Sequence, residues 1–220
     1  MKQAALSVVT QLQEAGYEAY FAGGCVRDGL LGRSCKDIDI VTSATPEQVE
    51  WVLERTEAIG AHFGVILAHE AGHSFEVATF RTDGVYSDNR RPDDVIFTTA
   101  EEDAYRRDFT INGIFEDPIT NTMYDYVGGE ADLKSAVIRS IGNPVDLFNE
   151  DALRLMRAVR FAVTLDFEIE PSTWKALQEC APLLKNISVE RITLELNKIL
   201  VHKNRLKGLE LMIQSGLMQY

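Results

Sequence analysis

The hydrophobic pattern of this 220-residue chain changes near residue 140. Before that point, short alternating stretches typical of half-buried strands are mixed with helical periodicity and glycine turns. From about residue 149 onward, every stretch has helical spacing. The pattern predicts an α+β domain over residues 1–140 and an all-α domain over residues 141–220. We expect strands at 17–22, 37–41, 62–69, 74–82, 113–116 and 123–126, and helices at 149–165, 171–181, 188–201 and 203–215.

Formal charge is distributed unevenly along the chain. The net charge of −12 by itself argues against a nucleic-acid partner. However, residues 151–220 hold ten Lys and Arg against eight Asp and Glu, whereas the first 150 residues hold twelve against twenty-six. An acidic segment followed by a mildly basic one suggests two tasks, divalent-metal binding in the first and phosphate binding in the second.

Composition excludes several classes of protein. With 45% hydrophobic and 25% charged residues, the chain is too apolar for intrinsic disorder. No apolar run approaches the roughly 18 residues of a membrane span, and the first residues do not form a signal peptide. Cys25, Cys35 and Cys180 lie far apart with no C-x-x-C pair. Their spacing argues against a disulfide framework or a zinc site and predicts a cytoplasmic protein with free thiols.

Asp37 and Asp39 lie two residues apart on a predicted strand, so both carboxylates point to the same face. Such carboxylates repel each other unless a cation lies between them, and Mg²⁺ is the usual one because it takes oxygen ligands and is often shared with substrate phosphates. A solvated strand edge is the alternative for an isolated Asp-x-Asp pair. The upstream turn Gly23-Gly24 and Arg27 form a predicted anion site, which favours nucleotide transfer.

Several segments resemble the signature of class II tRNA nucleotidyltransferases, the family of CCA-adding enzymes and bacterial poly(A) polymerases. These segments follow the family's order along the whole chain. They are GGCVRD at 23–28, LLG at 30–32, DIDI at 37–40, RRDFTIN at 106–112, DYVGG at 125–129 and EDALRLMRAVRF at 150–161. The resemblance implies a head domain of the nucleotidyltransferase (polymerase β-like) fold with a mixed sheet, followed by an all-α neck domain.

The resemblance also implies roles for acidic residues of the head. Asp37 and Asp39 would hold two Mg²⁺ ions, which would activate the 3′-hydroxyl of the RNA and steady the departing pyrophosphate. Glu76 lies where the family places a third acidic residue on a neighbouring strand. A surface glutamate is the alternative interpretation of this position.

Nucleotide binding is implied for a further set of residues in the matching motifs. Gly23, Gly24 and Arg27 would hold the phosphates. Arg107 would contact the nucleotide, with Asp108 and Asn112 near its ribose. The alternative for the Arg-Arg-Asp triplet is an ordinary helix end with local ion pairs.

A ribbon of charged side chains is predicted on the first helix of the neck, formed by Asp151, Arg154, Arg157 and Arg160 at three-residue steps. Cytosine and adenine both present an exocyclic amine beside a ring-nitrogen acceptor, so a carboxylate and a guanidinium can read both bases. Uracil and guanine would leave these charged groups unpaired. By the resemblance, Asp151 and Arg154 select the base, while Arg157 and Arg160 brace them or reach phosphates. A solvated basic helix face is the alternative.

Together these expectations predict a magnesium-dependent enzyme that adds CMP and AMP, from CTP and ATP, to the 3′ end of tRNA and releases pyrophosphate. A poly(A) polymerase of the same family, a variant that adds only the two cytidines, and an inactive RNA-binding module are the alternatives. The predicted mobile loop 83–94 favours complete CCA or terminal-A addition over addition of the cytidines alone. The intact pair of aspartates argues against an inactive module.

In the family, a body and a tail follow the neck, whereas this chain stops at Tyr220. We therefore expect these parts to be absent and binding to tRNA to be weak. Apolar residues near Leu209, Met212, Leu217 and Met218 would then be exposed. Such exposure predicts self-association into a homo-oligomer.

Overall fold

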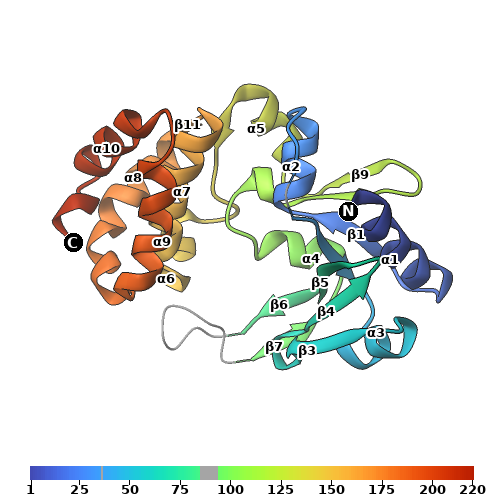
Figure 1. Ribbon diagram of the computed structural model, residues 1–220. Helices are drawn as coiled ribbons and strands as arrows, with labels where there is room; N and C mark the ends of the chain where they lie inside the picture. The colour runs from blue at the N-terminus through green and yellow to red at the C-terminus, as the bar shows by residue number, and fades with distance from the viewer. Residues whose placement is uncertain (36, 85–93) are drawn as a thin grey trace. The chain divides into compact units, whose positions relative to one another are not determined.

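The computed structural model describes residues 1–35, 37–84 and 94–220 of the chain (Figure 1). The described chain divides into two compact units. The first contains Met1–Gly84, Asp94–Arg107 and Ile111–Glu130, and the second contains Asp108–Thr110 and Ala131–Tyr220. Residues 85–93 of the predicted mobile loop lie outside the described residues. The domain boundary at residues 140/141 stays a prediction.

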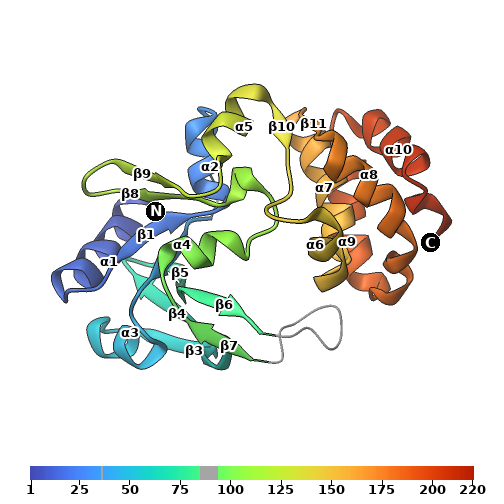
Figure 2. The same cartoon turned by 180° about the vertical axis from the view of Figure 1, so that it is seen from behind.

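A mixed sheet forms the core of the first unit, as predicted. Over the described residues it has seven strands in the order β3-β4-β5-β2-β1-β8-β9. Neighbouring strands are antiparallel except β2 and β5, which are parallel (Figures 1 and 2). The strands are β1 (Ala19–Ala22), β2 (Asp39–Thr42), β3 (Thr56–Gly60), β4 (Val65–Glu70), β5 (His73–Thr79), β8 (Ile114–Asp117) and β9 (Thr122–Asp125).

Short helices and a separate hairpin complete this unit. The hairpin pairs β6 (Arg81–Asp83) with β7 (Val95–Phe97). The helices are α1 (Lys2–Glu14), α2 (Gly24–Leu30), α3 (Pro46–Val52), η1 (Ala61–Phe63), α4 (Ala100–Tyr105), η2 (Thr110–Asn112) and α5 (Gly129–Ser135), of which η2 and α5 reach into the second unit.

One buried cluster links the sheet to α4. Ala100 and Ala104 of this helix pack with Tyr20, Val41 and Phe115, which come from three adjacent strands. Burying such apolar surface contributes about 25 cal/mol per Å² to stability. Gly23 of the predicted site follows β1 directly, and Asp39 is the first residue of β2. This core therefore fixes the positions of both residues.

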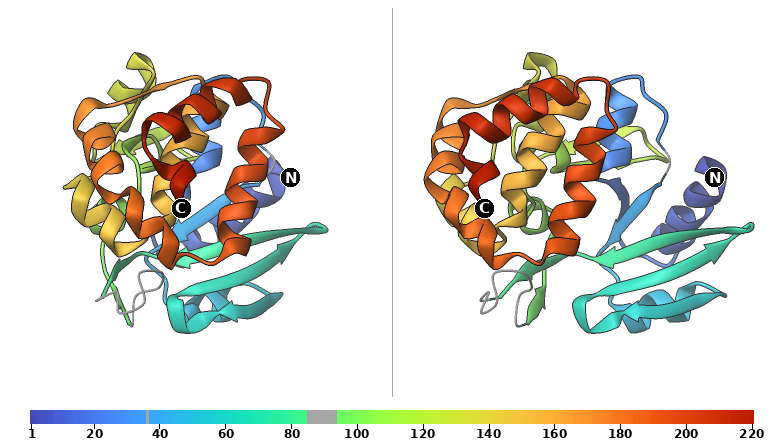
Figure 3. Two further views of the ribbon diagram at one scale, coloured as in Figure 1. Left: turned by 90° about the vertical axis from the view of Figure 1, so that its left-hand side faces the viewer. Right: turned by 60° about the vertical axis from the view of Figure 1, so that its left-hand side comes forward.

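Helices dominate the second unit, as predicted (Figure 3, orange to red). The helix α7 lies at its centre, in contact with α6, α9 and α10. The elements are β10 (Val137–Ile138), α6 (Pro144–Glu150), α7 (Leu153–Leu165), β11 (Glu168–Ile169), α8 (Pro171–Cys180), η3 (Ala181–Asn186), α9 (Val189–Leu200), α10 (Arg205–Gln214) and η4 (Leu217–Gln219). The short strands β10 and β11 pair in parallel.

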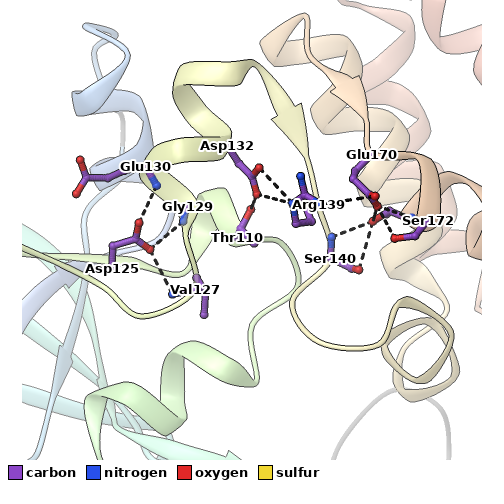
Figure 4. Close-up of polar contacts among 11 residues, drawn as sticks. Thr110, Asp125, Val127, Gly129, Glu130, Asp132, Arg139, Ser140, Glu170 and Ser172 are labelled. Carbon is purple, nitrogen blue, oxygen red and sulfur yellow. Dashed lines mark hydrogen bonds and ion pairs between the residues drawn. The ribbon is translucent and has the colours of Figure 1, made fainter.

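Two polar networks brace the connections between elements (Figure 4). In the first unit, the carboxylate of Asp125 accepts hydrogen bonds from the backbone amides of Gly129 and Glu130 at the start of α5, at 2.8 and 2.9 Å. In the second unit, the Arg139 guanidinium pairs with Asp132 at 3.0 Å and with Glu170 at 3.5 Å. Asp125 thus provides acceptors for the backbone amides at the start of α5. Asp132 and Glu170 provide charged partners for the Arg139 guanidinium.

The structure corrects three expectations about element boundaries. The expected strand 74–82 is two strands, because Phe80 is completely buried between β5 and β6 and the chain changes sheet there. The strand expected at 62–69 begins only at Val65, because residues 61–63 form the short helix η1. The carboxylate pair does not share a strand, because β2 begins only at Asp39 and Asp37 precedes it.

The end of the chain also differs from expectation. Met212 and Leu217 are buried and Leu209 is half-buried, because α10 and η4 fold back onto their neighbours. Met218 is exposed, as expected, at 55%. Over the described residues, no helix has the length and apolar character needed to cross a membrane.

Candidate nucleotide-transfer site

The turn after β1 brings a glycine against two charged side chains of the first unit. Gly23 has φ of +67° and ψ of −128°, a backbone conformation that favours glycine. A Cβ at this position would lie 3.5 Å from Nη1 of Arg107 and 3.6 Å from Oδ2 of Asp39. The structure therefore brings together Gly23, Arg107 and Asp39, which come from three separate sequence motifs.

The acidic residues gather at the start of β2. Parallel pairing of Ile40 with Val77 sets Asp39 beside Glu76 on the same face of the sheet. Asp37, Asp39 and Glu76 all line a pocket of about 340 Å³. Asp39 as a whole is exposed, but its carboxyl group is partly removed from water. This burial and the negative charges of Glu76 and Asp37 raise the pKa of Asp39, while the positive charge of Arg107 lowers it.

The cluster of Asp37, Asp39 and Glu76 can bind a divalent cation, although it does not supply all of the ligands of one. Across residues 1–35, 37–84 and 94–220, no three His, Cys, Asp or Glu side chains form a ready-made metal site. Mg²⁺ commonly binds to one or two carboxylates and completes its octahedron with water and substrate phosphates. The mutual repulsion at Asp39 and the all-oxygen donors fit this mode of binding.

Arg107 is held in place from two sides. Its Nε and Nη2 atoms donate to Oδ2 of the completely buried Asp103 at 3.1 and 3.0 Å, and Nη1 donates to the backbone oxygen of Asn112 at 3.4 Å. Burial would raise the pKa of Asp103, but Arg107 and Arg106 hold it below its usual value. The sequence reasoning missed Asp103, although its i,i+4 spacing from Arg107 on a helix is a detectable signal.

Arg27 lies mostly inside the first unit and connects two motifs. Its Nη1 donates to Oδ1 of Asn112 at 2.8 Å, and its Nε donates to Oδ1 of Asp28 at 2.8 Å. A Cβ on Gly24 would lie 3.7 Å from Nη2 of Arg27. The guanidinium thus borders the glycine turn while it fixes the Asn112 side chain.

In the second unit, Asp108 is paired with the second arginine of the predicted ribbon. Its Oδ2 atom accepts from Nε of Arg157 at 2.7 Å and lies 2.6 Å from Nη2, while Oδ1 caps the amide of Phe109. The Asp108 charge, opposed by burial, raises the pKa of Arg157. The Arg157 guanidinium also lies over the ring of Phe161, 5.3 Å from its centroid. Arg157 and Asp108 therefore brace each other.

The predicted helix 149–165 does not carry the whole ribbon, because Asp151 has an extended backbone between the end of α6 at Glu150 and the start of α7 at Leu153, whereas Arg154 lies on α7. Asp151 accepts a forked pair of hydrogen bonds from Arg191 of α9, at 3.2 and 2.8 Å. Arg154 is largely buried, and its Nη1 donates to the Leu147 carbonyl at 3.1 Å and to Glu150 at 2.5 Å. Arg191 lies 40 residues from Asp151 along the chain, so the fold is what brings the two side chains together.

Arg160, the last member of the predicted ribbon, forms an ion pair with the buried Glu195 of α9. Lys198 also donates to Glu195, at 3.0 Å, and the Arg160 guanidinium stacks 3.9 Å above the centroid of the Phe161 ring. Arg191 and Glu195 are four residues apart, so one face of α9 supplies partners to both ends of the ribbon.

Comparisons with known proteins show the family to which the chain belongs. Residues 19–139 match the poly A polymerase head domain family, and residues 166–220 match the family described as a probable RNA and SrmB-binding site of polymerase A. Similar curated proteins include the CCA-adding enzyme of Streptococcus gordonii, 45% identical over 99% of this chain and 55% of its own length. The CCA-adding enzyme of Limosilactobacillus reuteri is 47% identical over 97% of this chain and 53% of its own.

Solved structures with the same fold belong to the same group. The Bacillus stearothermophilus CCA-adding enzyme in complex with CTP superimposes with a TM-score of 0.91 at 43% identity, covering 98% of this chain and 52% of that one. The Thermotoga maritima CCA-adding enzyme complexed with tRNA gives a TM-score of 0.80 at 30% identity, covering 97% and 50%. The chain spans about half the length of the curated relatives it matches. Its sequence and fold place it in the family of CCA-adding enzymes and bacterial poly(A) polymerases, of which it carries the head and neck portion.

Proposed function

We propose that this chain carries the nucleotidyl-transfer centre of an RNA nucleotidyltransferase that adds CMP and AMP to the 3′ end of tRNA without a nucleic-acid template. The observation that carries the proposal is the joint placement of Asp39, Gly23 and Arg107, with Glu76 and Asp37 beside them. A carboxylate cluster next to a glycine turn and a fixed guanidinium provides for both a cation and a triphosphate.

In the proposed reaction, the 3′-oxygen of the RNA forms a bond to the α-phosphorus of the nucleotide. The bond from that phosphorus to the pyrophosphate breaks, and the hydroxyl proton leaves to solvent. Asp37 and Asp39 would hold Mg²⁺, with Glu76 as the third acidic residue of the centre. When bound, the ions supply charge stabilisation to the attacking and leaving oxygens. The protein's own contribution is to fix Asp39 and Glu76 on the adjacent strands β2 and β5, with Asp37 just before β2.

Triphosphate binding falls to the glycine turn and the two arginines beside it. Gly23 and Gly24 leave room for phosphate oxygens to approach the backbone, with Arg107 beside Gly23 and Arg27 beside Gly24. Asp103 holds the Arg107 guanidinium in a forked pair, so its position is set before the nucleotide arrives. Asn112, which Arg27 orients, and Asp108 would serve the ribose.

Selection of the base is assigned to Asp151 and Arg154. A carboxylate that accepts from an exocyclic amine and a guanidinium that donates to the ring nitrogen fit cytosine and adenine. Arg191 and Glu150 hold these side chains, while Arg157 and Arg160 brace α7 through their own carboxylate partners.

We also infer a cytoplasmic location and tRNA as the macromolecular substrate. The widely spaced Cys25, Cys35 and Cys180, all free thiols in the structure, support a reducing compartment. Two solved relatives are described in complexes with tRNA. Exposed apolar side chains near the end of the chain, among them Val201, Leu206 and Ile213, support self-association into a homo-oligomer.

A poly(A) polymerase is the second candidate, because the family matching residues 19–139 takes its description from that enzyme. The two candidates share the chemistry and differ in the number and identity of the nucleotides added.

Supplying the four nucleoside triphosphates separately tests the proposal. The RNA substrates are a tRNA lacking its terminal CCA and the same tRNA ending in CC, each with Mg²⁺. We expect CTP alone to extend the first, ATP alone to extend the second by one residue, and UTP and GTP to be rejected. Long adenylate additions to both would establish the poly(A) polymerase, and absence of any transfer by folded protein would refute the proposed function.

A further inference from the structure

A chain of ion pairs runs through the first unit from β6 to Arg107. β6 lies beside α4, and Asp83 of β6 is 3.6 Å from Nη1 of Arg106, which follows α4 (Figure 2). Nη2 of Arg106 lies 2.8 Å from Oδ1 of Asp103, and Oδ2 of Asp103 accepts the forked pair from Arg107. The two oxygens of one carboxylate thus hold two different arginines, so a change at one arginine affects the other.

The members of this chain are largely removed from water. The side chain of Asp103 is completely buried, that of Asp83 is 8% exposed and that of Arg106 is 21% exposed. Burial raises the pKa of Asp103, but Arg107 and Arg106 hold that pKa below its usual value, so the carboxylate is charged at neutral pH. Salt screens such pairs little, and the loss of one member leaves a neighbour with an unbalanced charge.

The β6–β7 hairpin provides a fixed support for the chain of ion pairs. The backbone amide of Arg81, in β6, donates to Oδ1 of Asp103 at 3.2 Å, and the Arg81 guanidinium donates to the Phe63 carbonyl. Phe97 of β7 packs against Gly64, where a Cβ would lie 2.9 Å from the ring. The hairpin is therefore anchored both to Asp103 and to the turn before β4.

We propose that Asp83 and Arg106 are positioning residues for the proposed nucleotide site, because they hold Asp103 and Asp103 sets the direction of the Arg107 guanidinium. The inference rests on the proposed function and adds to it two residues that act only through Arg107. Loss of either residue shifts Asp103, and Arg107 then no longer lies in line with the triphosphate.

The sign of the effect separates this role from a general effect of charge. Asp83→Asn removes a negative charge, which by itself would favour binding of an anionic triphosphate. Positioning predicts weaker binding instead, because Arg106 loses one of its two carboxylate partners and holds Asp103 less firmly.

Two substitutions at the hairpin provide the first test. The matched control for Asp83→Asn is Asp94→Asn, which removes the same charge at an exposed position immediately before β7. Thermal denaturation first establishes that both variants are folded. By titration calorimetry with CTP and Mg²⁺, we expect the Kd to rise about fivefold in Asp83→Asn and to stay within about twofold of wild type in Asp94→Asn. An unchanged or lower Kd in folded Asp83→Asn, or an equal rise in both variants, would overturn the proposal.

A double-mutant cycle shows whether the effect passes through Arg107. Arg107→Lys weakens CTP binding on its own, because lysine cannot form the forked pair with Asp103. In that background we expect Asp83→Asn to change the Kd by less than about twofold. A fivefold rise in both backgrounds would contradict the proposal. Arg106→Lys keeps the charge but loses the forked contacts, and it replaces Asp83→Asn in the cycle if that variant does not fold.

The Nε–Hε signal of Arg107 in a heteronuclear NMR spectrum measures the coupling without any nucleotide. This Nε donates to Asp103 at 3.1 Å, so a movement of Asp103 shifts the signal. We expect a shift in Asp83→Asn and none in Asp94→Asn. An unmoved signal in Asp83→Asn would overturn the proposal even if the wild type binds CTP and transfers its nucleotide. A shifted signal in a protein that binds no CTP would support the coupling while refuting the proposed function.

Discussion

Gly23 has a backbone conformation that few other residues adopt, and it lies between two charged groups of the site. An alanine there would cost about 1–3 kcal/mol in backbone strain. Its methyl group would also occupy the space between Arg107 and Asp39, where a phosphate oxygen is proposed to bind. We expect Gly23→Ala to lower the free energy of unfolding by that amount and to weaken CTP binding at least tenfold.

The matched control for this substitution is Gly16→Ala. Gly16 also has a positive φ, +92°, but a Cβ at this position would meet no atom within 4 Å. Urea denaturation should show a comparable loss of stability in both variants, whereas titration calorimetry should show weakened CTP binding only for Gly23→Ala. Equal CTP affinity in the two variants would argue against the phosphate assignment.

At the scale of single residues, the sequence could identify chemistry but not partners. The motifs marked Asp39, Arg107 and Asp151 as functional candidates. The hydrogen bonds that Arg107 donates to Asp103, and those that Arg191 donates to Asp151, depend on side-chain directions within the folded chain. The spacing of four residues between Asp103 and Arg107 can be read from the sequence. Arg191 is 40 residues from Asp151, so their contact could be found only from the packing of α9 against α7.

Among the helices, α8 has an N-cap whose contribution to stability should depend on pH. Glu170 accepts hydrogen bonds from the Thr173 amide at 2.8 Å and the Ser172 hydroxyl at 2.6 Å. Burial alone would raise the pKa of Glu170, but these bonds lower it to about 2 from an ordinary value of 4.5. Because the folded-state pKa is depressed, the stabilisation is complete above pH 4.5 and is lost as the pH falls towards 2.

Replacing this cap gives a measurable prediction. Glu170→Gln should lower the free energy of unfolding by about 1 kcal/mol at pH 7, and its difference from wild type should shrink below pH 4.5. The control is Glu168→Gln, whose side chain is 81% exposed and pairs with Lys207, and which should change stability by less than about 0.5 kcal/mol. Thermal denaturation from pH 3 to pH 7 measures both. A constant difference over this range would show that the carboxylate charge does not act through the cap.

Elements were predictable where local chemistry determines them. The capping box of Thr45 and Gln48 starts α3 as the sequence indicates, because both reciprocal hydrogen bonds are made within four residues. The hairpin of β8 and β9 was also predictable from its alternation and its turn. In contrast, β6 and β7 pair across residues 83 to 95, and β10 pairs with a strand about 30 residues away. Such pairs depend on tertiary contacts, which a local hydrophobic pattern does not encode.

In the whole molecule, the proposed site residues divide between the two compact units. The first unit holds the carboxylates, the glycine turn and Arg107, and the second holds Asp108, Asp151 and the arginines of α7. This division follows the change in charge along the sequence, from acidic to mildly basic. The order of the motifs was enough to predict both parts, because family resemblance covers the full chain. The chain of ion pairs from Asp83 to Arg107 was not predictable, because it depends on the packing of β6 beside α4.

The most direct measurement is extension of a tRNA lacking its terminal CCA by the purified chain with CTP, ATP and Mg²⁺. The wild type is compared with Asp39→Asn and with the control Asp146→Asn, an exposed residue of α6, after thermal denaturation has shown that all three are folded. We predict that the wild type and Asp146→Asn add nucleotides at similar rates. Asp39→Asn should be slower by about a hundredfold or more. A folded Asp39→Asn variant that extends the tRNA at the wild-type rate would contradict the account.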